Sequence, residues 1–202
     1  MHKEIFNKSQ LELLPYLSKF KRSFYLVGGT AIALHIGHRR SIDFDLFSYS
    51  KLKKWKIKST MMEVPFQQTL LFEDFDQIHY YINDVKVTFF NYPFQIEHKK
   101  IIDEFTMPSL LDLAAMKAFA LGRRSKWKDY VDLYFIIKNY FSIDEISRKA
   151  EQVFPGQFSE KLFRQQLAFH KDIDYTEEIE YLVNPVDENE IKDFLIEAVL
   201  EF

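Results

Sequence analysis

Asp43 and Asp45 are two carboxylates separated by one residue within an apolar segment, and they are well suited to metal chemistry. Successive side chains of a strand point to opposite faces of a sheet. We therefore expect both aspartates on one face, while Ile42, Phe44 and Leu46 pack into a core from the other. Carboxylate oxygens at this spacing suit Mg²⁺, which proteins usually hold with one or two carboxylates together with substrate phosphates. The pair predicts a magnesium site.

A glycine pair, Gly28-Gly29, lies between an apolar segment predicted to be a strand and a short predicted helix over residues 30–36. Bare backbone N–H groups at such a turn, together with the positive end of a helix, attract anions. Thr30 either donates its hydroxyl to the same phosphate or caps the helix. A phosphate cradle beside a magnesium-binding pair is the minimum equipment for nucleotidyl transfer.

Two arginines precede the carboxylate strand, and a lysine interrupts an apolar helix face further along the chain. Arg40 can clamp a phosphate with its guanidinium, whereas Arg39 is equally consistent with surface charge at a turn. Lys117 shares a stripe with apolar residues, so its ammonium needs an anionic partner. That partner is either Asp132 on the next predicted helix, or the triphosphate of a substrate, and both readings stay open.

These motifs occur in an order that resembles the nucleotidyl transferase AbiEii/AbiGii toxin family, a branch of the polymerase-beta-like nucleotidyltransferase fold. The resemblance extends over roughly residues 20–140 and is most specific in the glycine–aspartate block and the lysine–arginine–aspartate block. The matching segments are residues 27–31, 38–47, 85–93 and 117–133.

The resemblance implies an α+β fold, with a nucleotidyltransferase lobe containing a small mixed sheet in residues 1–107 and a C-terminal helical lobe packed against it in residues 108–202. It implies Mg²⁺-dependent transfer of a nucleoside monophosphate from an NTP to a hydroxyl of tRNA, and, as for a type IV toxin, a cognate antitoxin as partner. The catalytic residues it implies are Asp43, Asp45, Lys117, Asp129 and Asp132, the first two also binding metal. The nucleotide-binding residues it implies are Gly28, Gly29, Thr30, Arg40, Ser41 and Lys128.

One position departs from the family pattern. Family members usually carry a third carboxylate on a later strand, and Thr88 occupies that position here. The third acid commonly ligates one metal and orients or deprotonates the attacking hydroxyl, and threonine cannot accept a proton at neutral pH. Two alternatives follow: a slow or specialised transferase, or an impaired nucleotide-binding module of the same fold. Relatives within the wider fold add a third alternative, an enzyme that transfers AMP to protein.

Composition limits the classes further. The chain has 202 residues, of which 47% are hydrophobic, so it can bury a sizeable core. Its net charge of −3 favours no general binding to nucleic acid, and the absence of cysteine excludes disulfides and thiol catalysis. No segment approaches the roughly 20 apolar residues that span a bilayer, so we expect a cytoplasmic protein without membrane contact. The segment Lys51–Lys58, which includes Trp55, is either a solvated helix face or a contact for RNA.

Periodicity and turn residues predict the remaining elements. A leading helix is expected over residues 9–20, bent or restarted at Pro15. A tight turn at Asn83-Asp84 is expected to join two strands of a hairpin. The predicted strands are residues 66–73, 77–83 and 85–92. The predicted helices after the sheet are residues 109–122, 126–140, 143–153, 159–169 and 188–201, with Gly122 as a helix stop.

Overall fold

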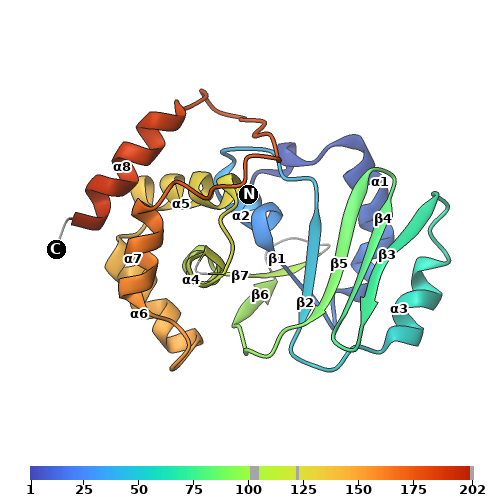
Figure 1. Ribbon diagram of the computed structural model, residues 1–202. Coiled ribbons are helices and arrows are strands. Elements are labelled where there is room, and N and C mark those ends of the chain that lie inside the picture. Colours follow the sequence, from blue (N-terminus) through green and yellow to red (C-terminus); the bar gives the residue numbers. More distant parts are fainter. Residues whose placement is uncertain (101–104, 122, 201–202) are drawn as a thin grey trace. The chain divides into compact units, whose positions relative to one another are not determined.

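The computed structural model describes residues 1–100, 105–121 and 123–200. Within it the chain forms two compact units, Met1–Ser109 and Leu110–Phe202. The first contains a five-stranded sheet with helices, and the second is helical (Figure 1).

The sheet of the first unit is mixed. Its strands, in spatial order, are β1 (Tyr25–Val27), β2 (Phe44–Ser48), β5 (Val85–Asn91), β4 (Gln77–Ile82) and β3 (Gln68–Asp74). The β2–β5 pairing is parallel and the other pairings are antiparallel. Asn83 and Asp84, with φ angles of 50° and 64°, form the two-residue turn between β4 and β5. A two-residue hairpin turn needs this left-handed backbone, so the predicted turn is confirmed.

The helical segments of the first unit are η1 (Lys3–Ile5), α1 (Lys8–Leu17), η2 (Ser18–Phe20), α2 (Gly28–Ile36) and α3 (Lys54–Met61). Asn7 and Gln10 form a capping box at the start of α1, which satisfies otherwise unpaired N–H groups. Pro15 lies inside α1, and the chain continues after that helix as a short 3₁₀ turn.

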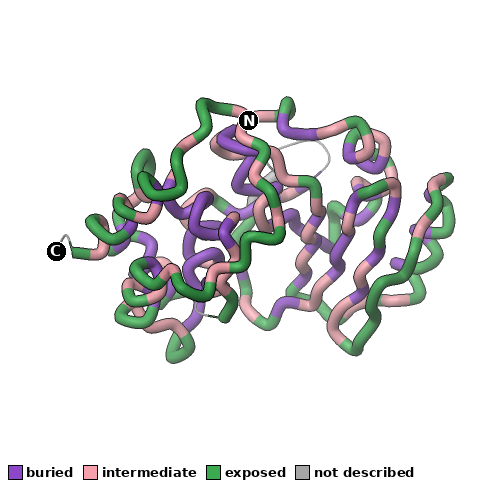
Figure 2. The backbone as a smooth tube through the Cα atoms, turned by 45° about the horizontal axis from the view of Figure 1, so that its top comes forward, coloured by how far each residue is buried: buried purple, intermediate pink, exposed green. Residues whose placement is uncertain are grey.

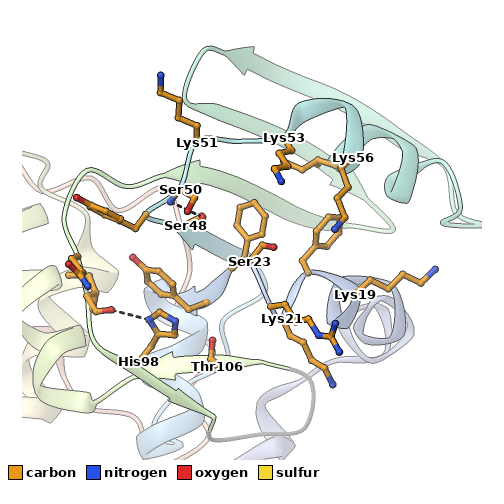
Figure 3. Close-up of a pocket in the computed structure, with 18 residues that line it drawn as sticks. Lys19, Lys21, Ser23, Ser48, Ser50, Lys51, Lys53, Lys56, His98 and Thr106 are labelled. Carbon is orange, nitrogen blue, oxygen red and sulfur yellow. Dashed lines mark hydrogen bonds between the residues drawn. The ribbon is translucent and has the colours of Figure 1, made fainter.

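A small hairpin of β6 (His98–Lys100) and β7 (Thr106–Pro108) was not predicted from the sequence. His98 and Thr106 from these strands, with the ends of β1 and β2 that carry Tyr25 and Ser48, line a cavity of about 630 Å³ (Figure 3).

Alternation along β2 builds the core beneath the sheet (Figure 2). Phe44 and Leu46 are fully buried. Phe89, the β5 neighbour of Leu46, meets the ring of Phe20 edge-on with 4.8 Å between centroids. The expectation that Ile42 packs into the same core is wrong, because its side chain is 44% exposed. The strand begins at Phe44, so the alternation rule does not extend back to residue 42.

The second unit consists of α4 (Leu110–Leu121), α5 (Trp127–Asn139), α6 (Ile143–Val153), α7 (Glu160–Ala168) and α8 (Glu188–Leu200). Each helix coincides closely with a segment predicted from apolar periodicity. The predicted ends at Gly122 and Glu201 lie outside the described residues. The α+β fold class is confirmed. Over the described part of the chain, every helix is too short or too polar to traverse a bilayer.

Candidate nucleotide-binding site

The glycine turn brings a carboxylate against the start of a helix. Gly28 begins α2 with a φ of +72°, a conformation that side chains disfavour. A Cβ atom at this position would lie 2.2 Å from Oδ2 of Asp45. Val27 and Asp45 are direct partners in the β1–β2 pairing, so the sheet register holds the carboxylate there. Glycine is therefore required at position 28 for both its backbone and its space.

The first turn of α2 presents backbone N–H groups, because no side chain caps this nine-residue helix. Uncapped N–H groups carry the positive end of the helix dipole and are a ready site for an anion. The turn and the Asp45 carboxylate thus stand together in the first unit, as the sequence predicted for a phosphate cradle beside a metal ligand.

Arg39, and not Arg40, lies at this turn. A Cβ atom on Gly29 would be 2.7 Å from Nη2 of Arg39 and 2.9 Å from Oγ of Ser41. The Arg39 side chain is buried, and its Nη1 donates to the Arg40 carbonyl at 2.9 Å. The Arg40 guanidinium donates instead to the carbonyl of Ile5 at 2.8 Å, which fastens η1. The geometry favours Arg39 as the phosphate-binding arginine.

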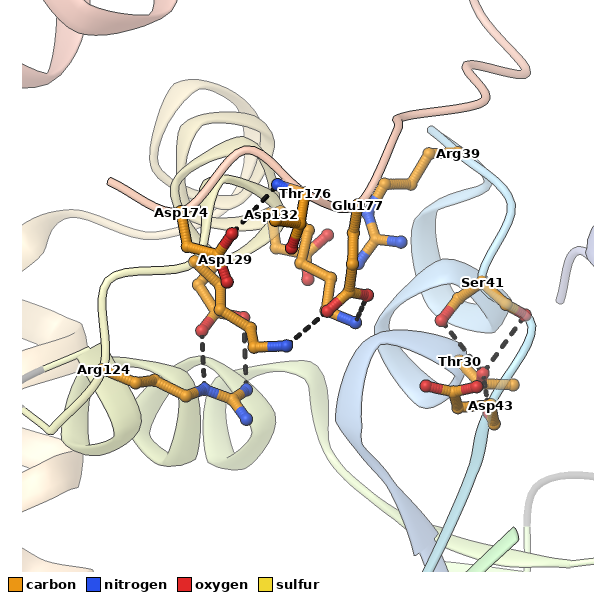
Figure 4. Close-up of polar contacts among 12 residues, drawn as sticks. Thr30, Arg39, Ser41, Asp43, Arg124, Asp129, Asp132, Asp174, Thr176 and Glu177 are labelled. Carbon is orange, nitrogen blue, oxygen red and sulfur yellow. Dashed lines mark hydrogen bonds and ion pairs between the residues drawn. The ribbon is translucent and has the colours of Figure 1, made fainter. Parts of the chain in front are cut away.

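The Thr30 hydroxyl has a structural partner. It is buried, and it bonds Oγ of Ser41 at 3.1 Å and the carbonyl of Asp43 (Figure 4). Gln10 donates to the Ser41 carbonyl at 2.9 Å from the other side. A hydroxyl has one proton to donate, so Thr30 uses it to hold the segment before β2 in place and not to bind a phosphate. Thr30 lies inside α2, whose cap position is Val27, and no side chain caps the helix. A phosphate contact from Thr30 would use its backbone N–H.

A row of polar residues crosses the sheet from Asp45. Thr88 on β5 is its neighbour in register, and His79 on β4 is the next neighbour of Thr88. His79 is half-buried, and its Nε2 lies 2.9 Å from Oε1 of Gln77. Burial and the nearby Lys86 lower the pKa of His79, while Asp45 opposes them. The imidazole is therefore neutral near pH 7. His79 was not among the residues predicted from the sequence, because its place beside Thr88 depends on strand register, which the sequence does not show.

Asp43 lies just before β2, and its charge acts on Tyr81 of β4. Loss of water contact raises the pKa of Tyr81, with further contributions from Asp84 and Asp43. Tyr81 and His79 are two residues apart on β4 and so share a face, and Asp45 acts on His79. Strand register places Asp45 on the face of Thr88 and His79. That Asp43 shares this face stays a prediction, because β2 begins at Phe44.

The donor set fits Mg²⁺ if a substrate completes it. Among the described residues there is no group of three or more His, Cys, Asp or Glu side chains arranged to hold a metal ion. Asp43 and Asp45 offer hard carboxylate oxygens, and Mg²⁺ commonly takes its remaining ligands from water and substrate phosphates. These two residues would hold the ion.

The second unit contains a buried charge cluster. Nζ of Lys117 lies 2.7 Å from Oδ1 of Asp129 and 2.9 Å from Oδ2 of Asp132. All three side chains are at most 5% exposed. Arg124 adds a contact of 2.9 Å to Asp129 (Figure 4). Burial tends to raise the pKa of Asp129, but the two cations hold it below its ordinary value.

This cluster settles one of the two readings of Lys117: the ion pair with Asp132 is present and joins α4 to α5. A catalytic role for Lys117, Asp129 and Asp132 stays a prediction. Lys128 binds the Glu177 carboxylate, as does Lys126, so its role in nucleotide binding also stays a prediction.

Known proteins resemble this chain in sequence and in fold. An uncharacterized protein of Aquifex aeolicus is 30% identical over 123 residues, which cover 58% of this chain and 59% of that protein. The chain thus matches little more than half the length of that relative.

Two solved structures share the fold. MenT4, a nucleotidyltransferase toxin from Mycobacterium tuberculosis, is 13% identical with a TM-score of 0.62, covering 94% of this chain and 80% of its own. JHP933 from Helicobacter pylori is 17% identical with a TM-score of 0.57, covering 96% and 88%. At these identities the likeness concerns the fold alone.

The sequence model of one family, described as nucleotidyl transferase AbiEii toxin, Type IV TA system, matches residues 13–200. That match includes the glycine turn, both aspartates of β2 and the charge cluster of α4 and α5. The resemblance drawn from the motifs is therefore confirmed: the chain belongs to the AbiEii family of nucleotidyl transferase toxins of type IV toxin–antitoxin systems.

Proposed function

We propose that this chain transfers a nucleoside monophosphate from an NTP to a hydroxyl group of tRNA. The observation that carries the proposal is the packing of the Asp45 carboxylate against Gly28 at the uncapped start of α2. An anion-binding backbone and a metal-binding carboxylate at one point suit a nucleoside triphosphate with its cation. The buried Arg39 beside Gly29 adds a positive charge for the phosphates.

The reaction is an in-line displacement at the α-phosphorus. The acceptor oxygen forms a bond to phosphorus, the bond from phosphorus to the bridging oxygen breaks, and pyrophosphate leaves. The N–H groups of Gly28, Gly29 and Thr30 hold the triphosphate, and Arg39 offsets the charge on the leaving group. Mg²⁺, held by Asp43 and Asp45, would supply positive charge to the phosphate oxygens.

The acceptor hydroxyl must lose a proton, and Thr88 cannot take it. His79 can, because it is neutral near pH 7 and follows Thr88 in the row that starts at Asp45. We assign His79 as the proton acceptor, a role that the family pattern gives to a carboxylate.

Thr88 also favours a second candidate function. In this candidate function the chain lacks a carboxylate beside Asp45, binds an NTP and transfers its nucleoside monophosphate poorly. It would then be an impaired nucleotide-binding module. A thermal shift with NTP and Mg²⁺ reports the affinity for the nucleotide alone, so a transfer assay is needed beside it to measure the chemical step.

Label transfer tests both candidates. Each α-³²P-labelled NTP is incubated with the protein, Mg²⁺ and total tRNA, in parallel with cell-lysate protein as acceptor. Asp45→Asn is the control, and we expect it to lower transfer by about 10²-fold or more. Label on tRNA that the control loses supports the proposal. Label on lysate protein alone overturns the tRNA acceptor, and NTP binding without label on either acceptor supports the impaired module.

Family membership also implies a partner. We propose that a cognate antitoxin protects the cell from this chain. Expression of the wild-type chain alone should arrest growth, Asp45→Asn should not, and co-expression of the antitoxin should relieve the arrest.

A further inference from the structure

The first unit contains a cavity remote from the glycine turn. It has a volume of about 630 Å³ and lies where β1 begins and β2 ends. The two strands are antiparallel, so this is the end opposite to the one that carries Gly28 and Asp45. Figure 3 draws the residues that line it, which come from η2 and the residues after it, from the segment around the start of α3, and from β6 and β7.

The cavity is strongly basic. No carboxylate lines it among the residues that the structure describes. Its basic residues are Lys21, Arg22, Lys51, Lys53 and Lys56, together with Lys19, whose ammonium is paired with Glu63 at 2.6 Å. They belong to two segments that border the cavity from different sides, so their charge is spread along it and does not converge on one point (Figure 3).

The lysines of the α3 segment divide into two groups. Lys54 and Lys58 lie 3.7 Å and 2.7 Å from the carboxylate oxygens of Glu73, outside the cavity. Lys53 and Lys56 line the cavity, and both are exposed. Glu73 therefore neutralises the lysines on one side of the segment, and the lysines on the other side line the cavity.

The floor of the cavity contains a buried polar group without a protein partner. Tyr25 is 2% exposed, and its ring stacks on His98 with 4.4 Å between centroids. Within the described part of the chain, the Tyr25 hydroxyl has no hydrogen-bond partner, and neither has Oγ1 of Thr106. Buried polar atoms are normally satisfied, so these two hydroxyls point to a ligand with hydrogen-bonding oxygens.

We propose that this cavity binds the sugar–phosphate backbone of a single-stranded segment of the RNA acceptor. The distributed cations match a polyanion, and the hydroxyls can donate to phosphate oxygens. Tyr49, a lining residue that is 60% exposed, offers a ring on which a base can stack. Trp55 is outside the lining, next to Lys56 on α3, and its 73% exposed ring offers a second platform. This inference rests on the proposed RNA acceptor.

The distance to the reaction centre fits such a strand. Tyr25 in the cavity is paired with Phe47, which shares the face of Asp45 and lies two residues from it on β2, about 7 Å along the strand. A strand held in the cavity can thus reach the carboxylates within a few nucleotides. The cavity would hold the acceptor behind its reacting end, while the glycine turn holds the NTP.

The test measures RNA binding apart from transfer. All proteins carry Asp45→Asn, and a fluorescently labelled single-stranded RNA is titrated by anisotropy. Lys53→Glu with Lys56→Glu is the cavity variant. Lys161→Glu with Lys171→Glu, two exposed lysines of the second unit, is the control with the same change in net charge. Circular dichroism melts confirm that each variant folds.

We expect the cavity variant to bind RNA at least tenfold more weakly than the control variant. We also expect the slope of log affinity against log salt to fall by ~0.7 for each lost phosphate contact. Tyr25→Phe, which keeps the ring and removes the hydroxyl, should weaken binding without changing the salt slope.

Equal affinities for the cavity and control variants would overturn the proposal. So would full displacement of the RNA by equimolar inorganic phosphate, since the cavity would then hold a free anion and no strand. The proposed function fails separately: RNA binding that depends on the cavity, with no label transferred by the wild-type chain, leaves this inference standing and removes the transfer.

Discussion

Asp45 and Thr88 are direct neighbours in the parallel pairing of β2 with β5, so a hydroxyl holds the position next to the carboxylate that we propose as a metal ligand. Thr88 is 8% exposed, and an added carboxylate there would face Asp45 at close range. Two like charges at such a site are unfavourable unless a cation lies between them. This relationship sets the first prediction.

Thr88→Asp should raise the rate of label transfer by about tenfold at saturating Mg²⁺, because it supplies a further metal ligand and a second proton acceptor beside His79. It should also lower the melting temperature without Mg²⁺, and added Mg²⁺ should restore it. Thr88→Val, which has the same size without the hydroxyl, is the matched control. An unchanged rate at saturating Mg²⁺ would count against a carboxylate-limited reaction.

His79→Gln should lower kcat for transfer by about 10²-fold while leaving KM for the NTP unchanged, since the imidazole acts on the acceptor proton and not on the triphosphate. Gln77→Ala removes the neighbour that bonds the ring and should have a smaller effect. In the double variant with Thr88→Asp, the new carboxylate should recover much of the loss. Equal losses of kcat in His79→Gln with and without Thr88→Asp would contradict the assignment.

Gly28→Ala should abolish NTP binding and lower the free energy of unfolding by about 1–3 kcal/mol. The methyl group would lie 2.2 Å from Oδ2 of Asp45, which would have to move, and the left-handed backbone would be strained. Gly156 has a φ of +70° with nothing within 4 Å of an added Cβ, so Gly156→Ala isolates the strain. Isothermal calorimetry with NTP and Mg²⁺ should show that Gly156→Ala keeps the wild-type affinity for NTP and Gly28→Ala loses it. Equal affinities of the two variants would contradict a role for the contact between residue 28 and Asp45.

Lys117→Met should lower the free energy of unfolding by about 3–5 kcal/mol, because it leaves two buried carboxylates with less positive charge between them. Adding Asp132→Asn should recover part of that loss. Urea unfolding measures both. An unchanged free energy of unfolding with a lower affinity for NTP would contradict this prediction. Lys117 would then bind the triphosphate and would not stabilise the packing of α4 on α5.

Acid should destabilise the second unit through Glu177. Burial tends to raise its pKa, but hydrogen bonds from Lys126 and Lys128 outweigh burial and lower the pKa to about 2. A carboxylate with a depressed pKa in the folded state stabilises the fold above its unfolded pKa, about 4.3, and loses that effect as pH falls towards 2. The melting temperature of Glu177→Gln should therefore change less between pH 5 and pH 3 than that of the wild type, whereas Glu151→Gln, an exposed control, should follow the wild type.

Local patterns predicted the elements whose signals are long or chemically specific. The helices of the second unit carry apolar periodicity over several turns, and Asn83-Asp84 is a turn pair with few other conformations. The β6 and β7 strands have three residues each, which is too few for an alternating pattern to be recognised. They are defined by their antiparallel pairing with each other.

The site was predictable in its motifs and not in its contacts. Gly28 and Asp45 share a motif, and the register places them together. Arg39 and Arg40 are adjacent, and only the path of the chain decides which guanidinium meets the glycine turn and which meets Ile5. His79 enters through strand pairing, which one sequence does not reveal.

The bonds made by Thr30 and Gln10 to Ser41 and Asp43 have a consequence for the affinity of the site. A loop that becomes ordered only when a ligand arrives subtracts its lost conformational entropy from the binding free energy. Here the chain between α2 and β2 gives up that freedom when the protein folds. Nucleotide binding then meets a preorganised surface, and we expect heat-capacity and entropy changes on binding that carry no signature of loop ordering.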